Sequence, residues 1–532
     1  MENINPFPVV VDSPALRPGL LFDVDSYPDF DIMDMADQLD YHHEEVNAEE
    51  EEEAEKFNYE EEEEQAFNSR AWFDILKHRL SSSSSPAAAK TPESAAAVGS
   101  RKLWTNEIIK LAGARIIQSR SSTDGIDVPA MFGGGLSQEE AKDVELMEHL
   151  LECAEKVGKG EFDRAIELLG RCNCWASQTG NPVQRLAYYF GNALRQRMEE
   201  GTEEVGAEAE QDDDDRKPFE SDTAVTLPDE HGVEFHKSVP FYTASQLAAV
   251  QIMMENVAGE KRIHVIELRI CSGLPMIALM QALTSSGPTN SIEMLRITAL
   301  ANDESEERFI HGSGERLVGF AKEMGLPFSF KIVRIWDSLA GAVHKDQLDL
   351  EPKEAAVVVA EFALNPLIAR PHRLESMMKL VRSIRPRVMV VTETEANHNA
   401  PDFGHRFVET LFTAGGHFDC LAECMAGNDA ARTAVESSYL NDRIRNILVA
   451  EGEKRIVRDV KLTVWRKYFA RFGMLEIAIR GLALQHASMV IRESPCAGSC
   501  LVALDFKSLV IGWKDTPLVF VSAWKFMKAV PQ

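Results

Sequence analysis

Three acids at predicted strand ends and one loop glycine could together line a ligand crevice. Residues 263–300 read as an apolar strand, a loop, an apolar helix and a second apolar strand, which is the pattern of a β-α-β unit. In this unit a nucleotide-type ligand lies at the carboxyl end of the first strand, held by a glycine-rich turn and by acids at the strand ends. The chain offers four such residues, namely Glu267, Gly273, Asp303 and Glu393.

The loop of this unit does not suit a phosphate-bearing cofactor. It contains a single glycine, Gly273, and the bulky Arg269 stands near the point where a ligand would approach the backbone. We therefore expect a Rossmann-like scaffold that binds no cofactor and performs no enzymatic reaction. The alternative is a small-ligand sensor, or an S-adenosylmethionine-type enzyme, that uses the crevice around Glu267, Asp303 and Glu393.

Three other features carry residue types that do chemistry. Residues 392–399 (TETEANHN) bring two glutamates, His398 and Asn399 together after an apolar strand, which fits a metal or acid–base site or a polar strand end that caps its neighbours. The basic stretch 443–461 predicts either a solvated helix face or a surface that contacts phosphates or partners. The eight cysteines lack zinc-ligand spacing, so we expect reduced core thiols and no metal site.

The negative charge of the chain is concentrated in two segments. The formal net charge is −29, yet residues 1–75 hold 23 Asp and Glu against three Lys and Arg, and residues 199–215 hold ten Asp and Glu with no Lys or Arg. The remainder is close to neutral, which argues against general polyanion binding by the folded part. The N-terminus does not read as a secretory signal, and no apolar run reaches membrane-spanning length.

Residues 1–135 are predicted to be mostly disordered, because acidic, serine and alanine–proline runs dominate them. Acids interleaved with aromatics in this region are typical of an activation segment that offers its aromatic side chains to a partner. Within it, residues 71–80 (AWFDILKHRL) place Trp72 and Phe73 on one helical face with two leucines. This helix is expected to fold on a partner or, alternatively, to dock on the chain's own domain.

From residue 136 the pattern becomes regular and predicts an α/β domain that opens with a capping box, Ser137-x-x-Glu140. Alternating strands and helices then predict a Rossmann-like, methyltransferase-like and mostly parallel sheet. The final segment SLVIGWKDTPLVFVSAWKF reads as a hairpin that gives this sheet an antiparallel end, with seven strands in all. The predicted parts of the domain, 136–532, are a helical cap at about 136–198 and 240–258, an acidic loop at 199–234 and a core at 259–532.

Several motifs in a fixed order resemble those of the GRAS family of plant transcriptional regulators over roughly residues 143–527. They are a leucine-rich helical stretch (LLECAEKVGKGEFDRAIELL), the box IHVIE at 263–267, the segment VMVVTETEANHN, the stretch RNILVAEGEKRIVRDVK and a final Ser-Ala-Trp at 522–524. The box departs from the family's Val-His-Ile-Ile-Asp pattern by Glu267. The core resembles the DELLA-like branches, but residues 1–135 contain no Asp-Glu-Leu-Leu-Ala segment.

The resemblance implies a non-enzymatic nuclear regulator that works through protein–protein contacts. The implied partners are other GRAS proteins, in homo- or heterodimers, and DNA-binding transcription factors, so that contact with DNA is indirect and no membrane is involved. In the family, the leucine-rich regions and the Val-His-Ile-Ile-Asp box are tied to such contacts. With the two aromatics of the N-terminal helix, the candidate partner-binding residues are Leu146, Leu150, Leu151, His264, Glu267, Leu374, Trp72 and Phe73.

Overall fold

The computed structural model describes eight segments of the chain. They are residues 69–82, 102–120, 136–206, 238–270, 273–285, 292–302, 304–335 and 345–527. All of them fall within one compact unit, Ala66–Gln532. Among the described residues, no helix is both long enough and apolar enough to cross a membrane.

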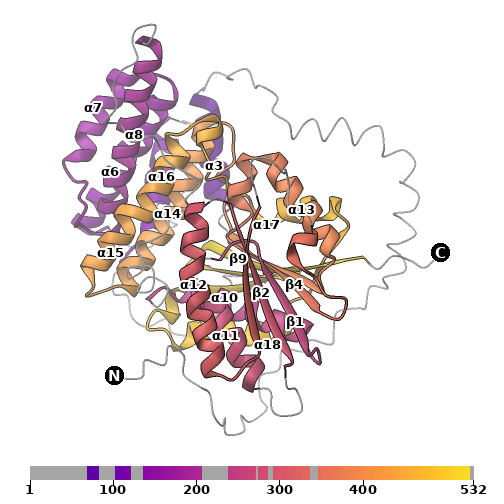
Figure 1. The fold of residues 1–532 in the computed structure, drawn as a ribbon. Coiled ribbons are helices and arrows are strands. Elements are labelled where there is room, and N and C mark those ends of the chain that lie inside the picture. Colours follow the sequence, from indigo (N-terminus) through magenta and orange to yellow (C-terminus); the bar gives the residue numbers. More distant parts are fainter. Residues whose placement is uncertain are drawn as a thin grey trace, which may run out of the picture. The chain divides into compact units, whose positions relative to one another are not determined.

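In the described part of the chain, a mixed nine-stranded sheet forms the centre of this unit (Figure 1). The strand order is β3-β2-β1-β4-β5-β9-β8-β7, and β6 pairs with β9 beside this row. Strands β1 to β5 are parallel and the others antiparallel, so the predicted Rossmann-like core with an antiparallel end is confirmed. Two short strands, β6 and β7, extend the expected seven to nine. The bounds are β1 Arg262–Glu267, β2 Met294–Ala301, β3 Phe328–Arg334, β4 Ala355–Glu361, β5 Val388–Thr394, β6 Met474–Ile477, β7 Cys500–Asp505, β8 Ser508–Trp513 and β9 Thr516–Phe526.

Helices cover both faces of the sheet because successive strand residues point into two separate apolar layers. Val265 of β1 packs in the layer that contains α10, α11, α12 and α18, whereas its neighbour Ile266 packs in the layer that contains α13 and α17 (Figure 1). Strand β5 is buried along its whole length, as expected for a strand covered on both sides. The bounds are α10 Pro240–Asn256, α11 Leu274–Ser285, α12 Glu304–Glu323, α13 Pro371–Ile384, α17 Leu462–Arg471 and α18 Gly481–Glu493.

A helical cap of α6, α7 and α8 lies beside α14, α15 and α16 (Figure 1). The predicted capping box is confirmed, because the Ser137 hydroxyl accepts from the Glu140 N–H and the Glu140 carboxylate accepts from the Ser137 N–H. Helix α10, predicted as part of the cap, packs against α18 and the sheet. Because it is covered from several sides, nearly all of its circumference is buried. The bounds are α6 Gln138–Gly158, α7 Phe162–Asn173, α8 Pro182–Gly206, α14 Phe403–Cys424, α15 Asp429–Val435 and α16 Asn441–Leu448; short helices span Lys345–Leu348, Asn365–Ala369, Gly452–Lys454 and Ala497–Ser499.

Helix α3 (Ser69–Ser82) is the helix predicted at residues 71–80 within the mostly disordered region. The Trp72 side chain is fully buried, and its ring centroid lies 6.0 Å from that of Phe407 on α14. The helix therefore docks on the chain's own domain, which was the alternative to folding on a partner. The average composition of the region does not reveal the apolar stripe of this helix, because acidic and serine runs lie on either side of it.

Helix α4 (Thr105–Arg120) is a second ordered element in that region, and no helix was predicted there from the sequence. Its apolar residues enter the main core, and polar contacts fix its start. The Asn106 amide donates to the Phe412 carbonyl at 3.0 Å and to the Thr516 hydroxyl at 2.6 Å. These partners are more than 300 positions away in the chain, so no local pattern reveals the contact.

We expect Trp72→Ala to destabilise the whole unit, because it removes a large, fully buried side chain next to Phe407. The expected loss in free energy of unfolding is about 3–5 kcal/mol. Urea denaturation followed by circular dichroism measures it. The matched control is Asp74→Ala on the exposed face of the same helix, with an expected change of about 0.5 kcal/mol or less. Equal effects of the two substitutions would show that α3 does not belong to the core.

Candidate functional site

Three carboxylic acids lie at the carboxyl edge of the sheet, where open α/β folds bind ligands. Glu267 ends β1, Glu361 ends β4 and Glu393 stands near the end of β5, and these three strands are neighbours. All three side chains are buried. The structure therefore brings the predicted residues Glu267 and Glu393 to one edge. It adds Glu361, which was not predicted although it also ends an apolar strand.

Burial changes what these acids can do. It raises the pKa of Glu267 well above its ordinary value, and the nearby Glu361 carboxyl raises it further. Burial also raises the pKa of Glu361, and it raises that of Glu393 to about 8. The pKa of about 8 favours the protonated form of Glu393 at neutral pH, whereas ribose hydroxyls are held by an ionised acid.

Two of the three buried acids already have partners within the chain. One Glu393 oxygen accepts from the backbone N–H groups of Leu364 at 2.7 Å and Asn365 at 3.3 Å. Glu361 accepts from the Gln246 amide at 2.9 Å. Gly273 has a positive φ of 71° just before α11, and Asp303 lies outside the described residues. Glu361 and Glu393 act here as internal acceptors that fix neighbouring segments.

A second polar cluster is centred on Asp459. His398 Nδ1 lies 2.7 Å from the Asp459 carboxylate, the Asn365 amide donates to that carboxylate at 2.9 Å, and Arg443 forms an ion pair with it. Burial raises the pKa of Asp459, but the charge of Arg443 and the His398 hydrogen bond outweigh burial and hold it at about 2. Asp459 is therefore an ionised acid inside the protein, neutralised by an arginine from α16.

Three arginines of the basic stretch 443–461 have neither of the roles predicted from its sequence. Arg455 and Arg458 are buried and donate to backbone carbonyls, Arg455 to His398 at 3.0 Å and Arg458 to Gly452 at 2.9 Å. Together with Arg443 they hold the loops that close the carboxyl edge of the sheet. The predicted solvated helix face and the predicted phosphate or partner surface are both wrong for these arginines, because their charge is used internally.

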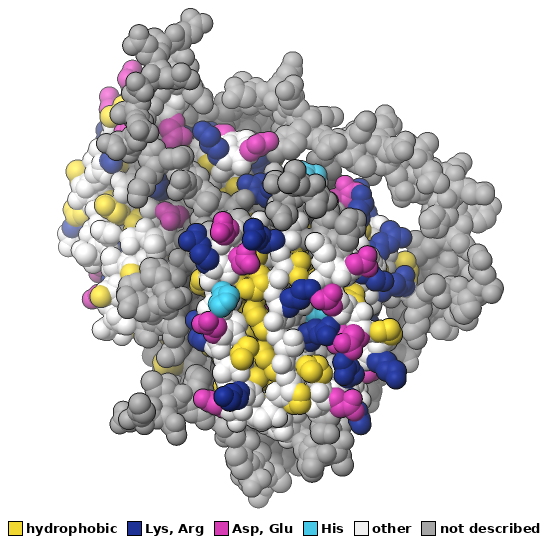
Figure 2. Space-filling view, in the orientation of Figure 1, with side chains coloured by type: hydrophobic (Ala, Val, Ile, Leu, Met, Phe, Trp, Pro, Cys, Tyr) yellow, Lys and Arg dark blue, Asp and Glu magenta, His cyan; other side chains and the backbone are white. Residues whose placement is uncertain are grey.

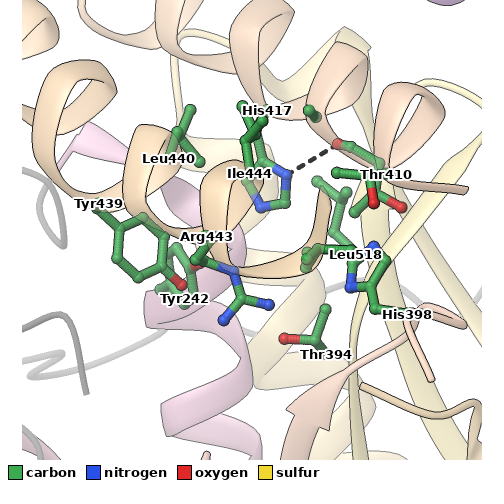
Figure 3. Close-up of a pocket in the computed structure, with 13 residues that line it drawn as sticks. Tyr242, Thr394, His398, Thr410, His417, Tyr439, Leu440, Arg443, Ile444 and Leu518 are labelled. Carbon is green, nitrogen blue, oxygen red and sulfur yellow. Dashed lines mark hydrogen bonds between the residues drawn. The ribbon is translucent and has the colours of Figure 1, made fainter. Parts of the chain in front are cut away.

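A small cavity lies next to this cluster, and His398 reaches it (Figure 3). His398 Nε2 is buried and has no hydrogen-bond partner among the described residues. The cavity has a volume of about 30 Å³, which is enough for a few waters but far below the roughly 300–1,000 Å³ of a drug-sized ligand site. Its lining residues include Tyr242, Thr394, His398, His417, Tyr439 and Arg443.

The His417 imidazole in this cavity is not set up as a general base near neutral pH. Burial lowers its pKa to about 4, and Nδ1 lies 2.9 Å from the Thr413 carbonyl oxygen. The lining offers hydroxyl and imidazole groups that can hold water. No lining side chain forms the pair of nucleophile and base that covalent catalysis requires.

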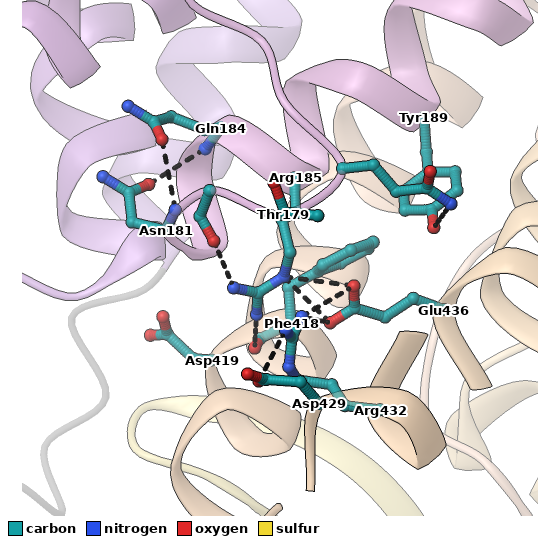
Figure 4. A network of polar contacts seen from close by, with 12 residues as sticks. Thr179, Asn181, Gln184, Arg185, Tyr189, Phe418, Asp419, Asp429, Arg432 and Glu436 are labelled. Atoms are coloured by element: carbon teal, nitrogen blue, oxygen red, sulfur yellow. Dashed lines mark hydrogen bonds and ion pairs between the residues drawn. The ribbon is translucent and has the colours of Figure 1, made fainter. Parts of the chain in front are cut away.

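A buried ion-pair network joins the cap to the core (Figure 4). Arg185 of α8 donates to both oxygens of Glu436 at 3.0 and 3.1 Å, and Arg432 of α15 donates to the same carboxylate at 3.2 and 3.3 Å. Glu436 is fully buried and begins a π-helical turn, Glu436–Leu440. The turn also places Tyr439 in the cavity wall, so one irregular turn connects the cap, the network and the cavity.

The residues predicted to bind partners are mostly internal. Leu146, Leu150 and Leu151 form the buried face of α6. His264 is buried, and its Nε2 lies 2.8 Å from the Thr298 hydroxyl of β2. Glu267, Leu374 and Trp72 are also buried, and Phe73 is partly buried. These side chains shape the scaffold in this conformation, and their role in partner binding stays a prediction.

The cysteine pairs 420/424 and 496/500 come close together in the fold. The Cys424 and Cys496 sulfurs are 3.0 Å apart, and those of Cys420 and Cys424 are 3.7 Å apart. The cysteines of the described segments are free thiols. In that part of the chain, no group of three or more His, Cys, Asp or Glu residues has an arrangement that could hold a metal ion.

Comparisons with known proteins agree on one family. The model of the GRAS domain family matches residues 146–525. The chain is 28% identical over 422 residues to DELLA protein GAIP from Cucurbita maxima, covering 77% of this chain and 69% of that protein. It is 28% identical over 389 residues to DELLA protein RGA from Arabidopsis thaliana, covering 73% of this chain and 62% of that protein. The crystal structure of SCL7 from Oryza sativa matches with a TM-score of 0.61 and 23% identity, over 71% of this chain and 99% of that one, which shows a shared fold.

We expect Glu436→Ala to cost about 3–5 kcal/mol in free energy of unfolding, because it leaves two buried guanidinium groups without their shared carboxylate. Chemical denaturation measures the loss. Asp429→Ala is the matched control: Asp429 pairs with the same Arg432 at 2.9 Å, but its side chain is 83% exposed, so we expect about 1 kcal/mol or less. A loss in the Glu436 variant as small as that of the control would contradict a structural role for the network.

The raised pKa of Glu393 predicts a pH-dependent stability that Glu393→Gln removes. The folded pKa of about 8 lies above the ordinary value of 4.5, so protonation stabilises the fold. This contribution is fully present below about pH 4.5 and is lost as the pH rises through about 8. Gln keeps the acceptor for Leu364 and Asn365 but cannot ionise. We expect the variant to gain roughly 2–4 kcal/mol in free energy of unfolding over the wild type between about pH 5 and pH 9.

Urea denaturation of the wild type and of Glu393→Gln at about pH 5 and about pH 9 measures this difference. The exposed Glu323 provides a control, since Glu323→Gln removes a carboxyl that is not buried. Parallel pH profiles for the wild type and Glu393→Gln would show that Glu393 is not protonated in the folded state.

Proposed function

Because the chain belongs to the GRAS domain family, a family of plant transcriptional regulators, we propose that it is a non-enzymatic nuclear co-regulator. It acts through contacts with other GRAS proteins and with DNA-binding transcription factors. The observation that carries the non-enzymatic part is the state of the acids at the carboxyl edge of the sheet, since all three are buried and Glu361 and Glu393 are hydrogen-bonded to the chain's own groups. A Rossmann-like sheet is thus retained as a scaffold.

Indirect contact with DNA is supported by the distribution of charge. Figure 2 shows Lys and Arg interspersed with Asp and Glu around a strip of apolar side chains on the face that it presents. The buried arginines of 443–461 are unavailable to a phosphate backbone. A duplex-binding domain would instead gather basic residues on one face around a reading element.

The acidic N-terminal sequence supports a division of labour within the chain. Residues 1–65 carry most of the excess of Asp and Glu and precede the compact unit that begins at Ala66. We assign output at the promoter to this sequence and partner binding to the unit. The boundary lies before α3, since Trp72 belongs to the core of the unit.

The expected result of a pull-down from plant nuclear extract with the full chain as bait is capture of GRAS proteins and DNA-binding factors, read by mass spectrometry. Deletion of residues 1–65 should preserve this capture but change the output of a reporter to which the chain is tethered, because only the acidic sequence is lost. Loss of capture in the deletion variant would contradict the division of labour. A thermal shift with millimolar S-adenosylmethionine would contradict the non-enzymatic assignment and favour the crevice alternative.

A further inference from the structure

A groove at the junction of α10, β6 and the start of α18 is far larger than the cavity beside His398. Its volume is about 300 Å³, which reaches the lower end of the range for ligand sites and accommodates a large side chain. It lies on the antiparallel side of the sheet, away from the acids of the crevice. The lining residues are Ile252, Glu255, Asn256, Ile477, Ala478, Ile479, Arg480 and Lys525.

The floor of the groove is apolar and continues to the surface. Ile252 and Ile479 are buried, and Ile477 is partly buried. Side chains two apart on a strand share a face, so Leu475 lies on the same face of β6 as Ile477. Leu475 is 46% exposed. An apolar stripe therefore leads from the floor of the groove to an exposed leucine.

The backbone beside the groove is extended. Residues 477–480 line it consecutively, so the chain runs along its length. In the described part of the chain, the strand partner of β6 is β9, with Met474 opposite Phe526 and Ile477 opposite Ala523. A partner segment in an extended conformation can follow this path and place alternate side chains on the apolar floor.

The rim of the groove carries more positive than negative charge. Arg480 and Lys525 line it, and both are exposed. The lining contains one acid, the partly buried Glu255, whose carboxylate accepts from the Gln251 amide at 3.0 Å. The rim thus favours carboxylates, while the floor favours Leu or Phe side chains.

We propose that this groove binds an extended acidic segment of a partner protein. A Leu or Phe side chain of that segment fills the cavity over Ile477 and Ile479, and flanking carboxylates lie against Arg480 and Lys525. A nucleic acid would satisfy the rim but leave the apolar floor without a partner, so the protein segment fits better. The inference adds a surface to the proposed function, but peptide binding can be measured whether or not the chain regulates transcription.

The test is fluorescence anisotropy with the purified full chain and a labelled peptide of about 12 residues that alternates Leu and Phe with Glu. We expect saturable binding that weakens about tenfold in the double variant Arg480→Glu, Lys525→Glu, because like charges then face each other. Lys322→Glu on α12 is the matched control, an exposed charge reversal outside the groove lining, and should bind as the wild type does. Circular dichroism confirms that the variants fold.

Two further measurements separate the floor from the rim. Ala478→Trp fills the groove from an exposed position, and should abolish binding without reversing any charge. A peptide with Ser in place of Leu and Phe should also fail to bind. Equal weakening by Lys322→Glu, or retained binding of the Ser peptide, would overturn the proposal in favour of unspecific charge attraction. Binding of a short DNA duplex, but not of the acidic peptide, through Arg480 and Lys525 would overturn it in favour of a nucleic acid.

Discussion

Carboxyl groups buried between the sheet and its covering helices have to be neutralised, and much of the structure is arranged around this constraint. Asp459 stays ionised because Arg443 and His398 reach its carboxylate. Glu436 is shared by two arginines, one from the cap and one from the core. Glu267 and Glu393 have raised pKa values and favour the protonated form. The groups that contact these carboxyls come from distant parts of the chain. Their contacts therefore fix the position of loops and helices at the carboxyl edge.

Helix α14 packs against the N-terminal helices and the terminal hairpin and so fixes their positions. At Gly415 a Cβ atom would lie 2.1 Å from the Asn106 side-chain oxygen, and at Gly416 it would lie 3.3 Å from Thr516. The two glycines therefore let α4 and the hairpin approach the helix backbone closely. This approach makes possible the Asn106 hydrogen bonds to Phe412 and Thr516. A region of mostly polar composition thus contributes two helices to the core of a GRAS domain.

The same constraint explains how a ligand-binding fold can serve as a scaffold. The carboxyl edge of the sheet keeps its topology, and its acids sit where a Rossmann-type site would use them. Hydrogen bonds from Gln246 and Leu364 occupy these acids, and the remaining cavity of about 30 Å³ holds only water-sized groups. Surfaces away from this edge, such as the groove beside β6, are then the places where a partner can be recognised.

The sequence by itself determined the elements whose signals are local. The apolar run at 263–267, the capping box at Ser137 and the Lys-Asp-Thr-Pro turn of the final hairpin were enough to predict the mixed sheet and the first helix of the cap. The family was predicted from the resemblance of ordered motifs, such as IHVIE and the final Ser-Ala-Trp, to those of its members. Tertiary structure alone decided which charges are internal and which helices join the core. Asp459 meets His398 across 61 positions and Arg185 meets Glu436 across 251. Local patterns report neither distance nor burial, so the basic stretch 443–461 could not be distinguished in sequence from an exposed one.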